Sequence, residues 1–275
     1  MSSAAVHRPP LGHRASRWFS ANLIRIYAVF AFAYLFVPIA YTVAFSFNDY
    51  RRTNLIWQGF TLKNWADPCG APEFCTALGN SVKIGLVATG VATVLGTMVA
   101  FALARYRFRG RAPTNSLIFL PMATAEVVMG ASLLALFLSI RFPLGFGTIV
   151  IAHVMFCLSF VVVTVKARIA GLDPSLEQAA MDLYATEWQT FRRVTLPLVM
   201  PGIVAGALLA FSLSFDDFII TNFNRGDTTT FPVQVYVSAQ RGIPAQANVI
   251  GTSMFLIALL VVVVGQFVGR RRRAG

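Results

Sequence analysis

Residues 148–197 read TIVIAHVMFCLSFVVVTVKARIAGLDPSLEQAAMDLYATEWQTFRRVTLP. The first part, Thr148 to Val165, carries no charged side chain. Because roughly 20 apolar residues in a helix cross a bilayer core of about 30 Å, this part predicts a membrane span that extends somewhat at both ends. The second part is polar and carries two signals for the start of a helix. We therefore expect a membrane span followed by a folded segment outside the membrane.

Five further apolar runs of similar length flank this stretch. Apolar residues make up 56% of the 275 residues and charged residues only 12%, with a mean hydropathy of +0.66, which excludes an ordinary soluble domain. The sequence predicts an all-α polytopic membrane protein with six transmembrane helices. The other five expected spans are Ile26–Phe47, Ile84–Ala104, Leu117–Ile140, Leu198–Asn222 and Val249–Val268.

The basic residues predict the orientation of the spans. They gather before the first span, after the second, between the fourth and fifth, and after the sixth, and such loops stay in the cytoplasm. Both termini are therefore expected to be cytoplasmic. We divide the chain into a basic segment (1–25), one transmembrane domain (26–268) and a basic tail (269–275). The net charge of +12 does not indicate a nucleic-acid partner, because the basic residues are scattered between apolar runs.

The three cysteines fall in two environments. Cys157 lies inside a predicted span, whereas Cys69 and Cys75 share the first predicted external loop, where oxidation is permitted. A local disulfide between Cys69 and Cys75 and a pair of free thiols both remain open.

The polar segment 173–197 predicts a hairpin of two short helices on the cytoplasmic side. Asp173 is suited to cap the first helix, with Pro174 at the first helical position, where a missing N–H is tolerated. Thr186 is suited to cap the second, with Gln189 three residues later completing a capping box.

The spacing inside this hairpin resembles the signature of bacterial ABC importer permeases. In that signature an EAA triplet is followed after three residues by Gly, and after nine more by I-x-L-P. Gln178, Ala179 and Ala180 occupy the triplet, Tyr184 the glycine place, and 194–197 (VTLP) the ending. Two positions depart from the pattern: Gln178 replaces Glu, with Glu177 beside it, and Tyr184 replaces Gly. Since Gly tolerates positive φ and Tyr does not, we expect Tyr184 to avoid that conformation and the turn to differ.

The resemblance implies that the hairpin docks into a cleft on a cytoplasmic ATPase subunit and couples nucleotide-driven closure to the membrane helices. Small side chains at Ala179 and Ala180 would permit close approach, and Leu183, Trp188 and Phe191 would supply apolar anchors. Packing of these three against the protein's own membrane helices is the alternative. The candidate coupling residues are Glu177, Gln178, Ala179, Ala180, Leu183, Tyr184, Leu196 and Pro197.

Three acidic residues lie within the predicted spans. Glu126 falls near the middle of the third span, and Asp216 and Asp217 near the outer end of the fifth. A carboxylate at mid-membrane costs roughly 2.5 to 3.5 kcal/mol on insertion, so such residues indicate function. Neighbouring helical residues point about 100° apart, so one aspartate is expected to cap or pair elsewhere. The alternative to a functional role is that neighbouring hydroxyls, such as those of Ser212 and Ser214, satisfy these aspartates by hydrogen bonding.

A narrower resemblance covers most of the chain. The runs LPMATAEVVMGASLLALF (120–137) and LAFSLSFDDFIITNF (209–223) resemble permease subunits of spermidine and putrescine importers. This resemblance implies a polycationic substrate, whose amines would gain from carboxylate counter-charges. We therefore expect Glu126 to line the substrate pathway. Asp217 and then Asp216 are the next candidates. His153, in the fourth span, is expected to be a hydrogen-bonded residue of the helix bundle.

The expected partners follow from the same resemblance. The sequence contains no GxxxxGK[ST] motif, so ATP and Mg are expected on a separate P-loop ATPase, in two copies, and this chain needs no cofactor or metal and is not itself an enzyme. The other expected partners are a second homologous permease, an extracytoplasmic substrate-binding protein and membrane lipid. The expected location is a bacterial inner membrane. Trp57, Trp65 and Phe231 either contact the binding protein or anchor the chain at the lipid headgroups.

Two alternatives to a polyamine importer stay open. One is an ABC importer permease for another small solute. The other is an ion-coupled secondary transporter, which would also use membrane carboxylates but would have no use for the hairpin signature. An intramembrane metalloenzyme is disfavoured, because the sequence has no HExxH motif and one histidine in its spans.

Overall fold

The computed structural model describes residues 11–50 and 54–274, with side-chain surroundings for 22–50 and 54–265. Residues 1–10 of the predicted basic segment and Gly275 of the predicted tail lie outside the described residues, as do Arg51 and Arg52. The chain forms two compact units: one holds the residues up to Gly70 together with those from Gly242 onward, and the other holds Ala71–Arg241.

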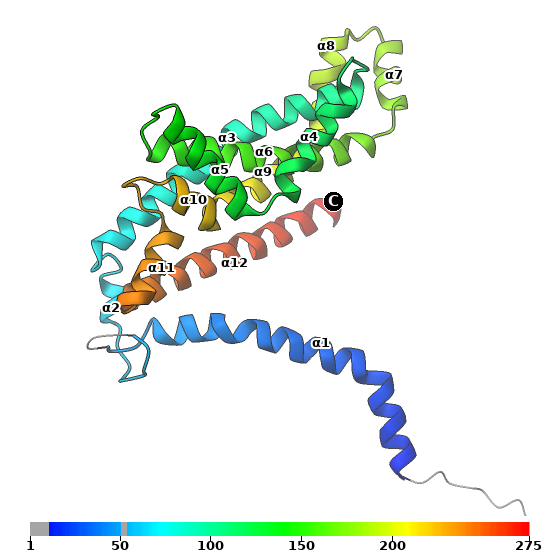
Figure 1. The fold of residues 1–275 in the computed structure, drawn as a ribbon. Helices are drawn as coiled ribbons and strands as arrows, with labels where there is room; N and C mark the ends of the chain where they lie inside the picture. Colours follow the sequence, from blue (N-terminus) through cyan, green and yellow to red (C-terminus); the bar gives the residue numbers. More distant parts are fainter. Residues whose placement is uncertain (1–10, 51–53, 275) are drawn as a thin grey trace, which may run out of the picture. The chain divides into compact units, whose positions relative to one another are not determined.

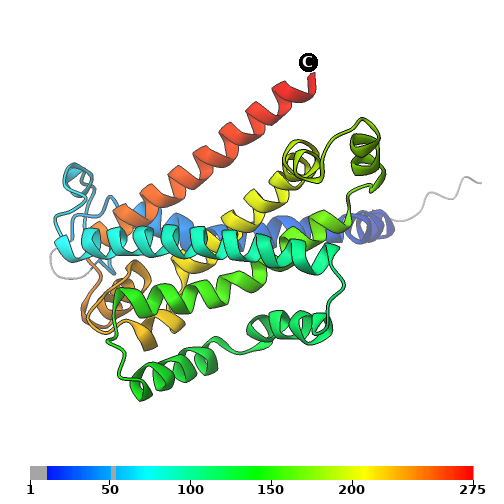
Figure 2. The same cartoon turned by 90° about the horizontal axis from the view of Figure 1, so that it is seen from above.

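The larger unit is built on three long helices that run side by side: α3 (Pro72–Arg105), α6 (Phe146–Ala170) and α9 (Leu196–Asp216) (Figures 1 and 2). Small residues bring these helices close together. A Cβ on Gly96 of α3 would lie 2.8 Å from Cγ1 of Val161 on α6, and one on Gly206 of α9 would lie 3.6 Å from Cα of Val161. Such glycine contacts are typical of packed membrane helices.

Shorter helices lie at both ends of this three-helix bundle. Figures 1 and 2 place α7 (Ser175–Asp182) and α8 (Glu187–Thr190) at one end, and α5 (Glu126–Ser139) and α10 (Ile219–Asn224) at the other. A single π-helical turn, η1 (Phe191–Thr195), joins α8 to α9. The unit is completed by α4 (Arg111–Ala123) and α11 (Phe231–Arg241).

The smaller unit contains α1 (Leu11–Phe45), α2 (Lys63–Ala66) and α12 (Ala245–Ala274), with α12 packing on both of the others. The segment after α1 is fixed to the start of α12 by two hydrogen bonds: Asn54 N donates to Ile243 O at 3.1 Å, and the Tyr50 hydroxyl pairs with Gln246 Oε1 at 3.1 Å. An isolated bridge between Asn48 and Phe60 is the one extended pairing within 11–50 and 54–274, so this part of the chain is all-helical.

Five helices of the described ranges are long and apolar enough to cross a membrane, and the bent pair α4 and α5 makes six if it counts as one span. The fourth predicted span is confirmed as longer at both ends, at Phe146–Ala170. The other four helices that are long and apolar enough to cross a membrane cover Asn22–Phe45, Pro72–Arg105, Glu187–Asp216 and Ala245–Gly265.

The predicted third span, Leu117–Ile140, is interrupted. The helix ends at Ala123, Thr124 and Ala125 are extended, and α5 leaves at 107° to α4, a bend that Figure 1 shows. Pro121 cannot donate to Leu117 O, but α4 continues two residues beyond it and Thr124 N still donates to Leu120 O at 3.0 Å, so the proline alone does not place the break. The mid-membrane depth inferred for Glu126 assumed a straight helix, so that estimate no longer applies.

The predicted fifth span, Leu198–Asn222, is also broken. Helix α9 stops at Asp216, Asp217 is extended with ψ 124°, and α10 starts at Ile219. Both interruptions fall beside the acidic residues singled out in the sequence.

Candidate functional site

The predicted cap of the second helix is present, whereas the first helix begins one residue later than predicted, at Ser175, with Pro174 rather than Asp173 in the cap position. Asp173 Oδ1 accepts a hydrogen bond from Ser175 N at 2.9 Å, and this bond holds the pKa of Asp173 below its ordinary value. Thr186 Oγ1 accepts from Gln189 N at 3.3 Å, while Gln189 Oε1 accepts from Thr186 N at 3.1 Å. The ends of both short helices are therefore satisfied within the hairpin itself.

The turn between the two helices contradicts the expectation for Tyr184. Its φ is +62°, the left-handed conformation that the tyrosine was expected to avoid. Ala185 N donates to Ala180 O at 3.1 Å and Tyr184 N to Met181 O at 3.0 Å, which is the Schellman pattern that ends a helix with a left-handed residue. The side chain of Tyr184 is 96% exposed, so the backbone strain of about 1–2 kcal/mol is not increased by a steric clash. The turn therefore adopts a left-handed conformation at a tyrosine, at the place where the resembled signature has glycine.

The candidate coupling residues divide into an outward and an inward set. Gln178, Ala179, Leu183 and Tyr184 are exposed, and Ala180 is partly exposed. Leu196 and Pro197 begin α9, with the proline in the first turn, where it is tolerated. Glu177 instead points back into the protein.

Glu177 belongs to a polar cluster that we call the clasp, formed with Arg105 and Thr195. The Glu177 carboxylate is ion-paired with Arg105, the last residue of α3. Thr195, the last residue of η1, donates its hydroxyl to Glu177 Oε1 at 2.7 Å, and Arg105 Nη2 lies 3.3 Å from the same hydroxyl. The clasp therefore joins the hairpin to α3 and to the start of α9. No sequence pattern indicates the clasp, since 72 positions separate Arg105 from Glu177.

Aromatic residues line a pocket of about 570 Å³ beside the clasp. Phe191 packs edge-on against Phe101 of α3 with ring centroids 5.3 Å apart, and Trp188 stacks on Phe191 at 5.6 Å. Phe191 is partly buried, as the packing alternative predicted, whereas Trp188 and Leu183 remain 66% and 80% exposed. An outward apolar surface is thus left on the hairpin at Leu183 and Trp188.

The two helix breaks set the surroundings of the predicted pathway acids. Glu126 lies in the first turn of α5, where the helix dipole favours a negative charge, and it is exposed. Asp216 is the last residue of α9 and is also exposed. Helix α5, which Glu126 begins, packs on α10, which follows Asp216 and Asp217 in the chain. The larger unit therefore presents two exposed carboxylates at the ends of interrupted helices.

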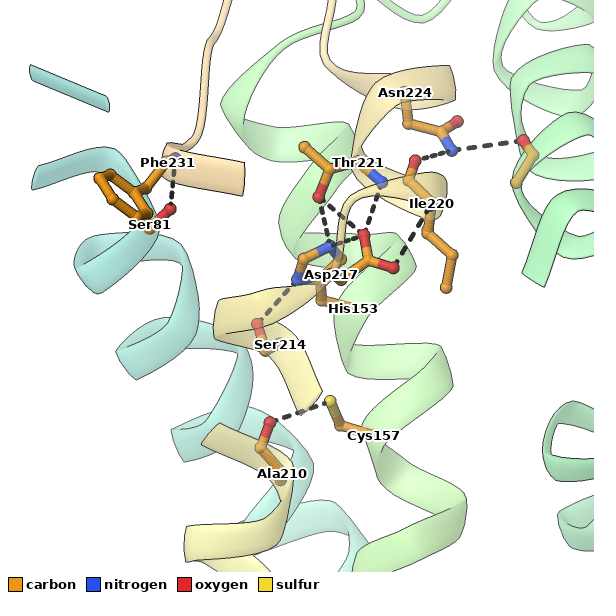
Figure 3. A network of polar contacts seen from close by, with 11 residues as sticks. Ser81, His153, Cys157, Ala210, Ser214, Asp217, Ile220, Thr221, Asn224 and Phe231 are labelled. Atoms are coloured by element: carbon orange, nitrogen blue, oxygen red, sulfur yellow. Dashed lines mark hydrogen bonds and ion pairs between the residues drawn. The ribbon is translucent and has the colours of Figure 1, made fainter. Parts of the chain in front are cut away.

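Asp217 differs from these two acids because it is buried and its carboxylate is hydrogen-bonded within the protein, as Figure 3 shows. Its carboxylate accepts from Ile220 N at 3.3 Å and from the backbone and hydroxyl of Thr221 at 2.8 and 2.9 Å. His153 Nε2 lies 3.3 Å from its Oδ2. Asp217 thus holds the start of α10, and the expectation that one of the two aspartates pairs elsewhere is confirmed.

His153 is the hydrogen-bonded bundle residue that the sequence predicted. Its Nδ1 lies 2.7 Å from the Ser214 hydroxyl of α9, and its Nε2 lies 2.9 Å from the Thr221 hydroxyl of α10 (Figure 3). Asn224 extends the network, donating to Gly130 O of α5 at 3.3 Å and accepting at its backbone carbonyl from the Thr148 hydroxyl of α6 at 2.7 Å. Four helices therefore meet around the α9–α10 break.

The cysteines behave in two ways. Cys69 and Cys75 are each disulfide-bonded, whereas Cys157 is a free, buried thiol whose Sγ lies 3.4 Å from Ala210 O. The local pairing of Cys69 with Cys75 stays a prediction.

Comparison with known proteins places these features in one family. Residues 92–273 match the model of the binding-protein-dependent transport system inner membrane component. The chain is 35% identical over 245 residues to the spermidine/putrescine transport system permease protein PotC of Escherichia coli strain K12, covering 89% of this chain and 92% of that protein. It is 36% identical over 229 residues to the putrescine transport system permease protein PotI of the same strain, covering 80% and 81%.

A solved structure shares the fold. A chain from a bacterial ABC transporter involved in the import of the acidic polysaccharide alginate matches with a TM-score of 0.67 at 17% identity, over 95% of this chain and all of that one. The exposed hairpin with its family signature, the apolar helices and the sequence match agree. The chain belongs to the family of inner membrane components of binding-protein-dependent transport systems.

Proposed function

We propose that this chain is one of two permease subunits of an ATP-driven importer whose substrate is a polyamine such as spermidine or putrescine. The sequence similarity to permeases that carry these names supports the assignment. The observation that carries the substrate class is the pair of exposed carboxylates, Glu126 and Asp216, at two helix interruptions that flank the contact between α5 and α10.

Exposed acids at broken membrane helices suit a polycation for a simple electrostatic reason. An ammonium group about 4 Å from a carboxylate gains about 4 kcal/mol at an effective dielectric constant of 20, before its desolvation is counted. Two carboxylates near one another repel, and a cation with two charges offsets this repulsion more fully than a cation with one charge. A diamine or triamine would therefore stabilise the arrangement more than a singly charged solute.

The proposed pathway uses Glu126 and Asp216 directly and Asp217 indirectly. The acceptor oxygens of Asp217 are occupied by Thr221, Ile220 and His153, so an amine would have to displace these partners to reach it. We therefore assign Asp217 as a positioning residue that fixes the α9–α10 break and, through it, the orientation of Asp216.

The coupling part of the proposal rests on the outward set of the hairpin. Gln178, Ala179, Leu183 and Tyr184 form the surface offered to an ATPase subunit, two copies of which would bind ATP and Mg for the transporter. The caps keep α7 and α8 rigid, so a push on the hairpin is passed on rather than absorbed. The clasp then carries that movement to α3 and α9, which supports alternating access between two states.

The remaining partners follow from membership in the family. A second homologous permease would complete the pathway, and an extracytoplasmic binding protein would deliver the solute and set most of its selectivity. With the hairpin and both termini in the cytoplasm, the α9–α10 break would face the delivery side.

Uptake measurements on the assembled transporter in proteoliposomes test this function. Glu126→Gln and Asp216→Asn are each expected to raise the spermidine concentration for half-maximal uptake about tenfold, which corresponds to about 1.4 kcal/mol of lost attraction. Glu73→Gln, which alters an exposed acid in the first turn of α3, is the matched control and should leave uptake unchanged. Unaltered uptake in both pathway variants would remove these acids from the route.

A further inference from the structure

The smaller unit carries an apolar surface that neither the transport pathway nor the hairpin explains. It consists of large apolar side chains in the segment after α1, which are between 49% and 72% exposed: Leu55, Ile56, Trp57, Phe60 and Leu62. We propose that this surface, the 55–62 face, inserts into the headgroup boundary of the bilayer and anchors the end of α1 there.

The segment that bears the 55–62 face is held by a buried polar network of three asparagines. Asn48 Nδ2 donates to Asn54 Oδ1 at 2.6 Å and to Ile56 O at 2.9 Å, and its Oδ1 accepts from Gln58 N at 2.7 Å. Asn64 Nδ2 donates to Asn48 O at 2.9 Å. Because the polar groups of the segment are satisfied inside it, its apolar side chains are the ones turned outward.

The face begins at the level where the span ends. The Trp57 ring contacts Phe45, the last residue of α1, edge to face with centroids 6.1 Å apart, and Phe45 stacks on Tyr41 at 4.1 Å. Phe60 stacks on Phe47, two residues beyond the helix, at 5.6 Å. Since α1 is a membrane span, side chains in contact with its last turn lie at the depth of the lipid headgroups.

The composition of the segment favours lipid over a soluble protein as the occupant. Residues 54–62, NLIWQGFTL, contain no charge, whereas Arg51 and Arg52 precede them and Lys63 follows. Apolar side chains flanked by cations are typical of surfaces that lie in the membrane interface, because the cations pair with lipid phosphates. A docking surface for a soluble protein would be expected to carry a polar rim among the apolar residues.

The other aromatic residues that the sequence left open do not share this exposure. The Trp65 indole N–H donates to Ser46 Oγ at 3.2 Å and its ring stacks on Phe47 at 5.4 Å. Phe231, in the larger unit, packs against Phe74 at 6.3 Å. Of Trp57, Trp65 and Phe231, Trp57 is therefore the one that belongs to the 55–62 face.

Site-directed spin labelling of the assembled transporter in lipid nanodiscs tests the proposal. A nitroxide is attached to Ile56→Cys, and to Leu62→Cys as an independent position, and its collision rates with oxygen and with a water-soluble nickel chelate are compared. Val261→Cys, an exposed position within α12, is the lipid reference, and Asp227→Cys, an exposed charged position, is the aqueous reference. The unsubstituted chain shows how far the existing cysteines react with the label.

Insertion predicts an oxygen-to-nickel collision ratio at positions 56 and 62 that is several-fold above the value at 227 and approaches that at 261. A ratio equal to that at 227 would overturn the proposal, because the face would then be in water. Immobilisation of the label only on addition of the substrate-binding protein would overturn it as well, because the face would then be a protein docking surface.

Discussion

Replacing Glu177 by glutamine removes the charge of the clasp while nearly preserving the shape of the side chain. The side chains of Arg105 and Glu177 are 34% and 24% exposed, so solvent screens part of an attraction of about 4 kcal/mol expected for charges about 4 Å apart at an effective dielectric constant of 20. Glutamine can still accept from Thr195, which retains part of the hydrogen bonding. We estimate a net loss of about 1–2 kcal/mol, which is a factor of about 5–30 in an opening equilibrium.

Hydrogen exchange of the chain in lipid nanodiscs without its ATPase measures this loss, since the partner then offers no protection to the hairpin. Backbone amides of α7 (Ser175–Asp182) in Glu177→Gln are expected to exchange about 5–30-fold faster than in the unaltered chain. Glu187→Gln changes an exposed glutamate of the neighbouring helix and is the matched control, with little expected change. The reasoning would be refuted if α7 exchanged at the same rate with Glu177→Gln as without it.

Three further outcomes follow from the structure. Asp217→Asn should lower the melting temperature of the purified transporter, by the equivalent of about 1–3 kcal/mol, because it weakens a buried hydrogen-bonded pair; an unchanged melting temperature would contradict the positioning role. Tyr184→Gly removes about 1–2 kcal/mol of left-handed backbone strain, while the greater entropy of the unfolded chain costs about 0.5–1 kcal/mol of stability. The backbone amides of α7 should therefore exchange slightly more slowly in this variant. Tyr184→Ala keeps the strain and should not slow the exchange. Mass spectrometry without reductant should find a peptide that links Cys69 to Cys75, and alkylation of both thiols would rule that link out.

Features that depend on a few neighbouring residues could be predicted from the sequence. The Thr186–Gln189 capping box and the hydrogen bond from Ser175 N to Asp173 are formed within three positions along the chain, so residue types and spacing were sufficient. The apolar runs gave the helices for the same reason, because each run is long enough to cross a bilayer without help from a neighbour.

Features that depend on distant partners were missed or misjudged. The break at Asp217 is stabilised by His153, which lies on another helix, so a continuous apolar run gave no sign of it. Tyr184 was misjudged because the backbone pattern of the turn, set by Ala180 and Met181, overrides the local preference of the side chain.

The central claim is that an ATPase acts on this chain through the hairpin, and uptake by reconstituted vesicles tests it most directly. The complete transporter and its Ala179→Arg variant, which places a long cation on the exposed docking surface, are compared in proteoliposomes loaded with ATP. We expect polyamine uptake by the complete transporter, near-complete loss in the variant despite normal membrane insertion, and loss when the ATPase subunit is omitted. Full uptake by vesicles that lack the ATPase would contradict it.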